Sequence, residues 1–170
     1  MRVLALATCA AIAAIAPSAA AAPERSVPIR VGVGIGPINL GMTGQQVRRA
    51  LGRPTAVIER RVIGGRPYLE LDYGLGRWNV GLLGRKGSRR VVLVGTGLAR
   101  HRTPQGLGVG STAGQIEREL RGSRRRICRF AKVQWYLRTG SAETVFFPAR
   151  YESVTVGVEV RAAPTLGCAF

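Results

Sequence analysis

Short runs of β-branched and aromatic residues, separated by glycine-rich turns, dominate the hydrophobic pattern of the chain. Alternating hydrophobic and polar positions are typical of half-buried strands, and clusters such as "GG", "GLG" and "GRKG" are typical of the turns between them. The pattern predicts two groups of strands. The expected strands lie near 56–62, 67–73, 78–83, 91–94, 133–138, 143–147 and 154–160.

Two short segments have a helical pattern instead. Thr43 is followed three residues later by Gln46, and Thr112 by Gln115. This T-x-x-Q spacing is typical of a capping box, in which hydroxyl and amide each satisfy a backbone N–H at the start of a helix. Apolar residues at helical spacing follow each box and a glycine ends each segment, so the pattern predicts two helices of only two or three turns.

The two helical segments belong to an internal repeat, because residues 38–52 align with residues 107–121. Gly41 meets Gly110 in this alignment, two residues before each capping threonine. We therefore expect an α+β domain of two tandem units, each a short capped helix followed by an antiparallel three- or four-stranded meander, with the helices on one face of the sheet. The predicted organisation is a signal peptide (1–21), a flexible lead-in (22–37), unit 1 (38–106) and unit 2 (107–170), together one compact domain.

The glycines of "VGVGIGPINLGMT" (31–43) resemble the start of a dinucleotide-binding turn. That fingerprint needs G-x-G-x-x-G at the opening of a long helix. The position of the third glycine holds Asn39 when the motif is counted from Gly34 and Pro37 when it is counted from Gly32, and the helix that follows is short. The recurrence of Gly41 as Gly110 indicates a turn that glycine adopts easily, and no cofactor site is predicted.

The N-terminus has the basic, apolar and small-residue order of a secretory signal peptide, with Ala19 and Ala21 before the expected cleavage point. Thr8 precedes Cys9 and the apolar run continues beyond it, which argues against a lipid anchor at Cys9. No later stretch approaches the ~20 apolar residues of a membrane helix. We expect a secreted or periplasmic protein with no transmembrane span.

Two cysteines, Cys128 and Cys168, remain after cleavage at this point. In a compartment that permits disulfides we expect them to pair, and closure of the loop would stabilise the fold by roughly 4 kcal/mol. Metal binding is the alternative, but two thiols without a nearby histidine do not complete a zinc site. No metal site is predicted.

Arginine supplies nearly all of the 26 basic residues, and the formal net charge is +17. The densest cluster is Arg124, Arg125 and Arg126, the candidate contacts for a polyanion. A surface of this charge attracts acidic wall polymers or anionic lipid outside the cell. Composition alone is the alternative explanation, and no dedicated nucleic-acid site is predicted.

Catalytic residues are not predicted. The single histidine, His101, lies in a basic connector with no acidic neighbour to orient it. Glu70 and Asp72 share one face of a predicted strand, where solvated carboxylates beside arginines explain them. No metalloprotease, nucleophile-elbow or C-x-x-C motif is present.

Aromatic residues collect on the predicted strands. Rings interleaved with arginine are typical of protein-binding surfaces, and the alternative is that about half of the rings belong to the core. Trp135 and Tyr136 are adjacent, so one of them faces the helices and the other the open side of the sheet. The candidate protein-binding residues are Tyr68, Tyr73, Trp78, Trp135 and Tyr136.

The segment "INLGMTGQQVRRALGRP" resembles the signature of the SmpA/OmlA family of outer-membrane assembly lipoproteins, and the strands that follow resemble that family's meander. The tandem arrangement is similar to that of the β-lactamase inhibitory protein. These resemblances imply a sheet that presents one face to a protein target, in an inhibitor or an envelope-assembly factor.

The sequence as a whole predicts a secreted, non-enzymatic protein that recognises another macromolecule, another secreted or envelope protein, through the exposed face of its sheet. The alternative is a basic envelope protein that binds anionic wall polymer or lipid by charge.

Overall fold

An eight-stranded antiparallel sheet forms most of the structure. The structure is a computed structural model, and it describes residues 26–61, 65–74, 77–127, 133–148 and 155–162. Its strand order is β4-β5-β6-β7-β12-β11-β10-β9, and a second sheet has the order β3-β2-β1-β8. The strands are β1 (Val27–Arg30), β2 (Gly34–Ile35), β3 (Ile38–Asn39), β4 (Ala56–Arg61), β5 (Pro67–Tyr73), β6 (Trp78–Leu83), β7 (Arg90–Thr96), β8 (His101–Arg102), β9 (Arg124–Ile127), β10 (Val133–Thr139), β11 (Ala142–Pro148) and β12 (Thr155–Ala162).

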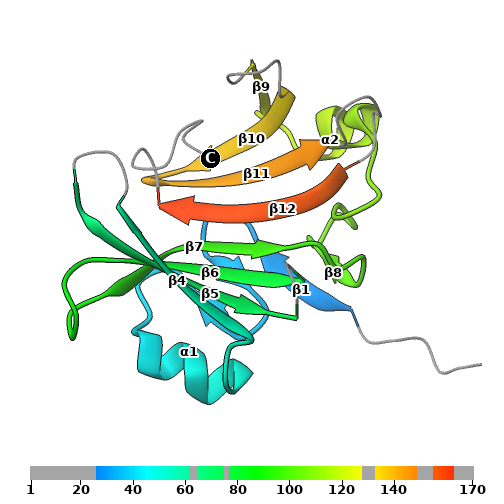
Figure 1. Ribbon diagram of the computed structural model, residues 1–170. Helices are drawn as coiled ribbons and strands as arrows, with labels where there is room; N and C mark the ends of the chain where they lie inside the picture. The colour runs from blue at the N-terminus through cyan, green and yellow to red at the C-terminus, as the bar shows by residue number, and fades with distance from the viewer. Residues whose placement is uncertain (1–25, 62–64, 75–76, 128–132, 149–154, 163–170) are drawn as a thin grey trace, which may run out of the picture.

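The large sheet is assembled from two meanders that follow one another in the chain. Strands β4–β7 follow helix α1 (Gly44–Leu51), and strands β9–β12 follow helix α2 (Ala113–Glu119). The meanders meet where β7 pairs with β12, with Val94 opposite Val160 and Thr96 opposite Val158. Figure 1 shows β4–β7 below and β10–β12 above this junction, with the helices at opposite ends.

The expected α+β class of two helix-plus-meander units is wrong. The structure is mainly β, with 51% strand and 13% helix, and its only two helices in the described residues are short. A second sheet, not a helical layer, supplies much of the cover of the large sheet. Sequence patterning missed this sheet because its strands of two to four residues are too short to show a period.

The hydrophobic core lies on one face of the large sheet, which we call the inner face. Strand register places Leu71, Val80, Val94 and Val160 on it, and all four side chains are fully buried. The core cluster also contains three isoleucines of the small sheet, which lies behind β5–β7 in Figure 1. Those three, Ile29, Ile35 and Ile38, have no exposed surface.

The segment 22–37, expected as a flexible lead-in, instead contributes β1 and β2 over its described residues. The Gly32 N–H donates to Thr144 Oγ1 on β11 at 2.9 Å, and a Cβ on Gly36 would lie 3.2 Å from the Trp78 ring. These glycines therefore allow a narrow chain to approach the inner face closely. The signal peptide (1–21) and Cys9 lie outside the described residues.

Both capping boxes form as the sequence predicts. Thr43 Oγ1 accepts from the Gln46 N–H at 3.2 Å, and the Gln46 amide oxygen accepts from the Thr43 N–H at 2.7 Å. In α2 the corresponding distances between Thr112 and Gln115 are 3.3 and 2.8 Å. Val47 and Ile116 then anchor the two helices in the core.

Gly41 and Gly110 have φ angles of 83° and 92°, a region that side chains disfavour. A Cβ on Gly41 would meet no atom within 4 Å, so its backbone conformation and not lack of space requires glycine. The seven strands expected from the alternating pattern are confirmed to within about three residues at each end. Across the described residues, neither helix has the length and apolar character to span a membrane.

Replacement of either capping threonine tests whether the two boxes are equivalent. Thr43→Ala and Thr112→Ala should each lower the free energy of unfolding by about 1 kcal/mol, because each leaves a first-turn N–H without its side-chain acceptor. Urea denaturation measures this loss. Gln45→Ala, in the same first turn but outside the box, is the control, and an equal loss there would contradict the role of the cap.

Candidate functional site

The face of the large sheet opposite the core, which we call the outer face, carries most of its charged side chains. Register aligns Asp72, Glu159 and Tyr136 in one row that crosses from β5 to β10. A second row contains Glu70, Gly81, Leu93, Arg161, Glu143 and Arg138. Within the described residues, no hydrogen bond or core contact brings a helix or the small sheet onto this face.

Tyr68 lies on the outer face toward the β4 edge, where Gly81 on β6 leaves room for its ring. A Cβ on Gly81 would overlap the Tyr68 ring and hydroxyl, and Tyr68 is only 2% exposed. The Asn79 side chain likewise packs over Gly95, where a Cβ would overlap its amide group. Glycines in strand interiors weaken a sheet, so their presence here indicates that the packing of Tyr68 and Asn79 over them is specific.

Three ion pairs lie on the outer face, and the charges of two of them act on Tyr68. Arg161 Nε lies 2.7 Å from Glu159 Oε2, and its guanidinium lies 5.0 Å from the centroid of the Phe147 ring. Arg138 Nη2 lies 3.1 Å from Glu143 Oε1, whose side chain is 4% exposed. Because buried charges are tolerated only when they are paired, these contacts fix the geometry of β10, β11 and β12.

A third, looser pair joins Arg60 to Glu70 at 3.8 Å between Nε and Oε2. The Arg60 side chain is half exposed, so this pair adds little stability. It does place both charges near Tyr68. The outer face is therefore charge-balanced around Tyr68 although the chain as a whole is strongly basic.

Burial raises the pKa of the Tyr68 hydroxyl above its ordinary value of 10.0, and the negative charges of Glu70 and Glu159 raise it further. Arg60 and Arg161 oppose this shift without cancelling it. A phenol with a raised pKa stays protonated at neutral pH and does not act as a general base. Arginines pair with the two carboxylates beside it, so the cluster is suited to stabilising the packing of the sheet and not to proton transfer.

A shallow hollow of about 310 Å³ opens at the β9–β10 end of the outer face. Tyr136 and Arg124 are direct cross-strand partners there, and Arg138 lies one row away on β10. Gly122 completes the lining. The Arg124 and Arg138 side chains are exposed, while Tyr136 is half-buried. One aromatic ring between two arginines is the side-chain composition most typical of binding hot spots.

The structure separates the five candidate aromatic residues. Tyr68 and Tyr136 lie on the outer face, while Tyr73, Trp78 and Trp135 lie on the inner face. The two tryptophans are 9% and 8% exposed and belong to the core cluster. Strand alternation separates Tyr68 from Tyr73 and Trp135 from Tyr136, so the five residues do not share one surface.

Trp135 is also tied to a helix, because its Nε1–H donates to Glu117 Oε1 at 3.0 Å. Trp78 packs edge-on against the His101 ring, with 4.5 Å between centroids. His101 itself is fully buried in β8, and its Nδ1 lies 2.6 Å from Thr96 Oγ1. The histidine expected in a polar connector is therefore part of the support beneath β6.

The arginine cluster lies on β9, where alternate residues face opposite sides. Arg124 pairs with Tyr136 and so belongs to the outer face, whereas Arg125 pairs with Trp135. Both side chains are exposed, and the side chain of Arg126 lies outside the part of the structure that is described. The predicted disulfide partners Cys128 and Cys168 also lie outside the described residues. In the described ranges, no group of three or more His, Cys, Asp or Glu residues is placed to hold a metal.

Sequence reasoning missed the charged residues of β10, β11 and β12. The alternation of "TVGVEVRA" in β12 contains the signal, because it places Glu159 and Arg161 on the side opposite Val158 and Val160. Arg161 pairs with Glu159 on its own strand, and Glu143 pairs with Arg138 across β10 and β11. The place of Glu159 and Arg161 beside Tyr68 depends on the β7–β12 register. Local sequence does not specify that register.

No family model and no curated protein matches this sequence. The fold is similar to that of an extracellular protein containing an SCP domain from Bacillus anthracis strain Ames, with a TM-score of 0.54 and 13% identity over 89% of this chain and 51% of the other. It is also similar to a cysteine-rich secretory protein from Staphylococcus aureus Mu50, with a TM-score of 0.51 and 11% identity over 84% and 48% of the two chains. The present chain spans about half the length of each.

A third structure, the DUF4309 family protein YjgB from Bacillus subtilis strain 168, has 21% identity over 71% of this chain and 78% of its own, with a TM-score of 0.46. The first two likenesses concern the fold alone. None of the three proteins is an SmpA/OmlA lipoprotein or a β-lactamase inhibitory protein, so those resemblances stay predictions.

The close fit of Tyr68 over Gly81 predicts a coupled pair. Gly81→Ala should lower the free energy of unfolding by about 1–3 kcal/mol, because the added methyl group displaces the Tyr68 ring. In a Tyr68→Ala background the same substitution should cost much less. A double-mutant cycle measured in urea tests this coupling, and additive losses would contradict the packing.

The buried phenol also predicts a loss of stability in alkali. Above pH 10 an unfolded tyrosine releases its proton while folded Tyr68 keeps it, so the free energy of unfolding should fall by up to about 1.4 kcal/mol per pH unit until the raised pKa is reached. Tyr68→Phe should remove this part of the slope. Denaturation curves collected between pH 8 and 11 measure it, and equal slopes for the two proteins would contradict the burial of the phenol.

Proposed function

We propose that this protein is a secreted, non-enzymatic binding protein that recognises another macromolecule through the outer face of its large sheet. The observation that carries the proposal is the hollow formed by Tyr136, Arg124 and Arg138 at the exposed end of that face. Tyr and Arg dominate binding hot spots because each combines a large contact area with hydrogen-bonding groups.

The ion pairs of β10, β11 and β12 stabilise the strands that carry this site. Arg138 is held by Glu143, and β11, which carries Glu143, pairs with β12 and its Arg161–Glu159 pair. A site built on paired strands loses little conformational entropy when a partner binds. Strand pairing therefore holds the backbone of the hollow before a partner binds.

Secretion is supported by the N-terminal pattern of residues 1–21 and by two proteins of similar fold, of which one is extracellular and the other is a secretory protein. Absence of catalysis is supported by the arginine partners of Glu70, Glu143 and Glu159 and by the protonated state of Tyr68. The partner that we propose is a secreted or envelope protein, in the role of an inhibited enzyme or of a component in envelope assembly.

Binding of an anionic polymer or lipid by charge is the second candidate. It is favoured by exposed arginines at the end of α1, where Arg48 and Arg49 stand in the last turn, and in the turn after β6 at Arg85. Such binding depends steeply on salt, because it releases counterions. A hot-spot interface depends on salt much less.

The proposal predicts that Tyr136→Ala combined with Arg138→Ala removes the binding of the partner. The protein carrying both changes should capture from the extracellular and envelope fractions of its source about 30-fold less of the wild-type partner, since loss of a hot spot costs about 2 kcal/mol or more. Quantitative affinity capture at low and high salt measures the difference.

Arg118→Ala combined with Arg121→Ala is the matched control, because it removes exposed arginines near α2 without touching the outer face. Circular dichroism confirms that both variants fold. Retention of every partner by the Tyr136 and Arg138 variant would contradict the site. Loss of all capture at high salt would favour the polyanion candidate.

A further inference from the structure

Strand β4 is an edge of the large sheet, and its residues from Ala56 to Arg60 are exposed. Its only strand partner among the described residues is β5, so half of its backbone N–H and C=O groups face away from the sheet. Only three large hydrophobic side chains of the described residues are exposed. Two of them, Val57 (51%) and Ile58 (37%), lie side by side on this edge, and the third is Val33.

The two residues point to opposite faces of the sheet. Val57 pairs with Leu71 on the inner face, and Ile58 pairs with Glu70 on the outer face. An additional strand beside β4 would therefore find an apolar contact on each side. Exposed edges of this kind are usually blocked by lysine, proline or a bulge, because they pair readily with other chains.

A groove of about 500 Å³ borders β4 on the inner face. Its apolar lining is Val57, Leu69 and Leu82, and its walls are α1 and the turn between β6 and β7. The cationic residues of these walls are Arg48 on α1 and Lys86 and Arg89 on the turn. The groove thus combines an apolar floor with a positively charged rim.

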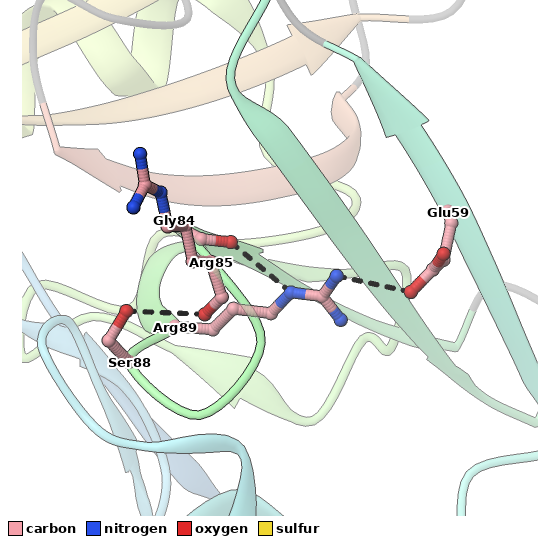
Figure 2. Close-up of polar contacts among 5 residues, drawn as sticks. All are labelled: Glu59, Gly84, Arg85, Ser88 and Arg89. Carbon is pink, nitrogen blue, oxygen red and sulfur yellow. Dashed lines mark hydrogen bonds and ion pairs between the residues drawn. The ribbon is translucent and has the colours of Figure 1, made fainter.

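Arg89 and Glu59 neutralise each other within this groove. Arg89 Nη2 lies 3.1 Å from Glu59 Oε1, and Arg89 Nε donates to the Gly84 carbonyl at 3.3 Å, as Figure 2 shows. Glu59 is the only carboxylate among the described residues that line the groove. Arg48 and Lys86 form no ion pair with another described residue, so the rim keeps a net positive charge.

We propose that β4 accepts an extended acidic segment of a partner protein as an additional strand. The backbone of this segment pairs with the free edge of β4, and alternate side chains enter the groove. Apolar residues of the segment contact Val57, and carboxylates contact Arg48 and Lys86. Strand addition uses main-chain hydrogen bonds for affinity and side-chain pockets for specificity.

A second copy of this chain is a poor occupant. Each copy has a formal net charge of +17, so two copies repel one another, and β4 itself contributes Arg60 and Arg61. An acidic segment, by contrast, is attracted by the positive charge of the chain. This inference does not rest on the outer-face site, because the groove opens on the inner side of the opposite end of the sheet.

The test uses a fluorescent peptide of alternating valine and glutamate and the full protein, with affinity measured by fluorescence anisotropy. Arg48→Glu combined with Lys86→Glu should weaken binding by at least about tenfold, because two attractive contacts become repulsive. Arg49→Glu combined with Arg85→Glu is the matched control, since it makes the same charge change on the same two elements outside the groove. This control should change the affinity by less than about threefold.

A peptide methylated on alternate backbone nitrogens separates strand addition from attraction by charge alone. It should bind at least about tenfold more weakly, because it cannot donate hydrogen bonds to β4. Equal binding of the methylated peptide, equal losses in the two double variants, or no binding of the first peptide would each overturn the proposal. A dimer of the free protein that Val57→Lys dissociates would also overturn it, because the edge would then be occupied by a second copy.

Discussion

The antiparallel pairing of β7 with β12 is the constraint on which the rest of the structure depends. It joins two meanders that are distant in the chain into one sheet, with Val94 opposite Val160 at the junction. Without this ladder each half would have a further unpaired edge and an apolar face too small for a stable core. With it, one continuous inner face is buried by the small sheet and the two helices.

The pairing of β7 with β12 also determines which charged residues lie next to one another on the outer face. Because β12 lies in the middle of the sheet, Glu159 and Arg161 are brought beside residues of the first meander, and both act on Tyr68. The glycines at positions 81 and 95 make the space that Tyr68 and Asn79 occupy. The charges of β12 are thus paired and packed in the middle of the sheet, and both proposed binding sites lie toward its two edges.

Local patterns in the sequence predicted local structure well. The T-x-x-Q boxes, the glycines before them and the alternation within the strands each depend on neighbouring residues, and each is found. Alternation also separates Glu70 and Asp72 from Leu69 and Leu71. What the sequence did not show was the pairing of strands far apart in the chain, because no short-range pattern encodes register.

Because the sequence does not show long-range strand pairing, the structure differs from the prediction in two respects, the small sheet and the placement of the aromatic residues. The small sheet pairs β1 with β8, whose residues lie more than seventy positions apart, so 22–37 looked like a flexible lead-in and the fold like an α+β domain. Alternation in the sequence separated Trp135 from Tyr136, but it did not show which of the two faces is covered. Tyr136 remains at the candidate site, whereas Trp78 and Trp135 serve the core.

Hydroxyl-radical footprinting of the protein, free and with the partner captured on wild type, tests the central claim that the sheet has a buried inner face and a binding outer face. The account predicts that Tyr136 is labelled in the free protein and protected in the complex, while Trp78 and Trp135 are protected in both. Labelling of the two tryptophans in the free protein, or unchanged labelling of Tyr136 in the complex, would contradict it.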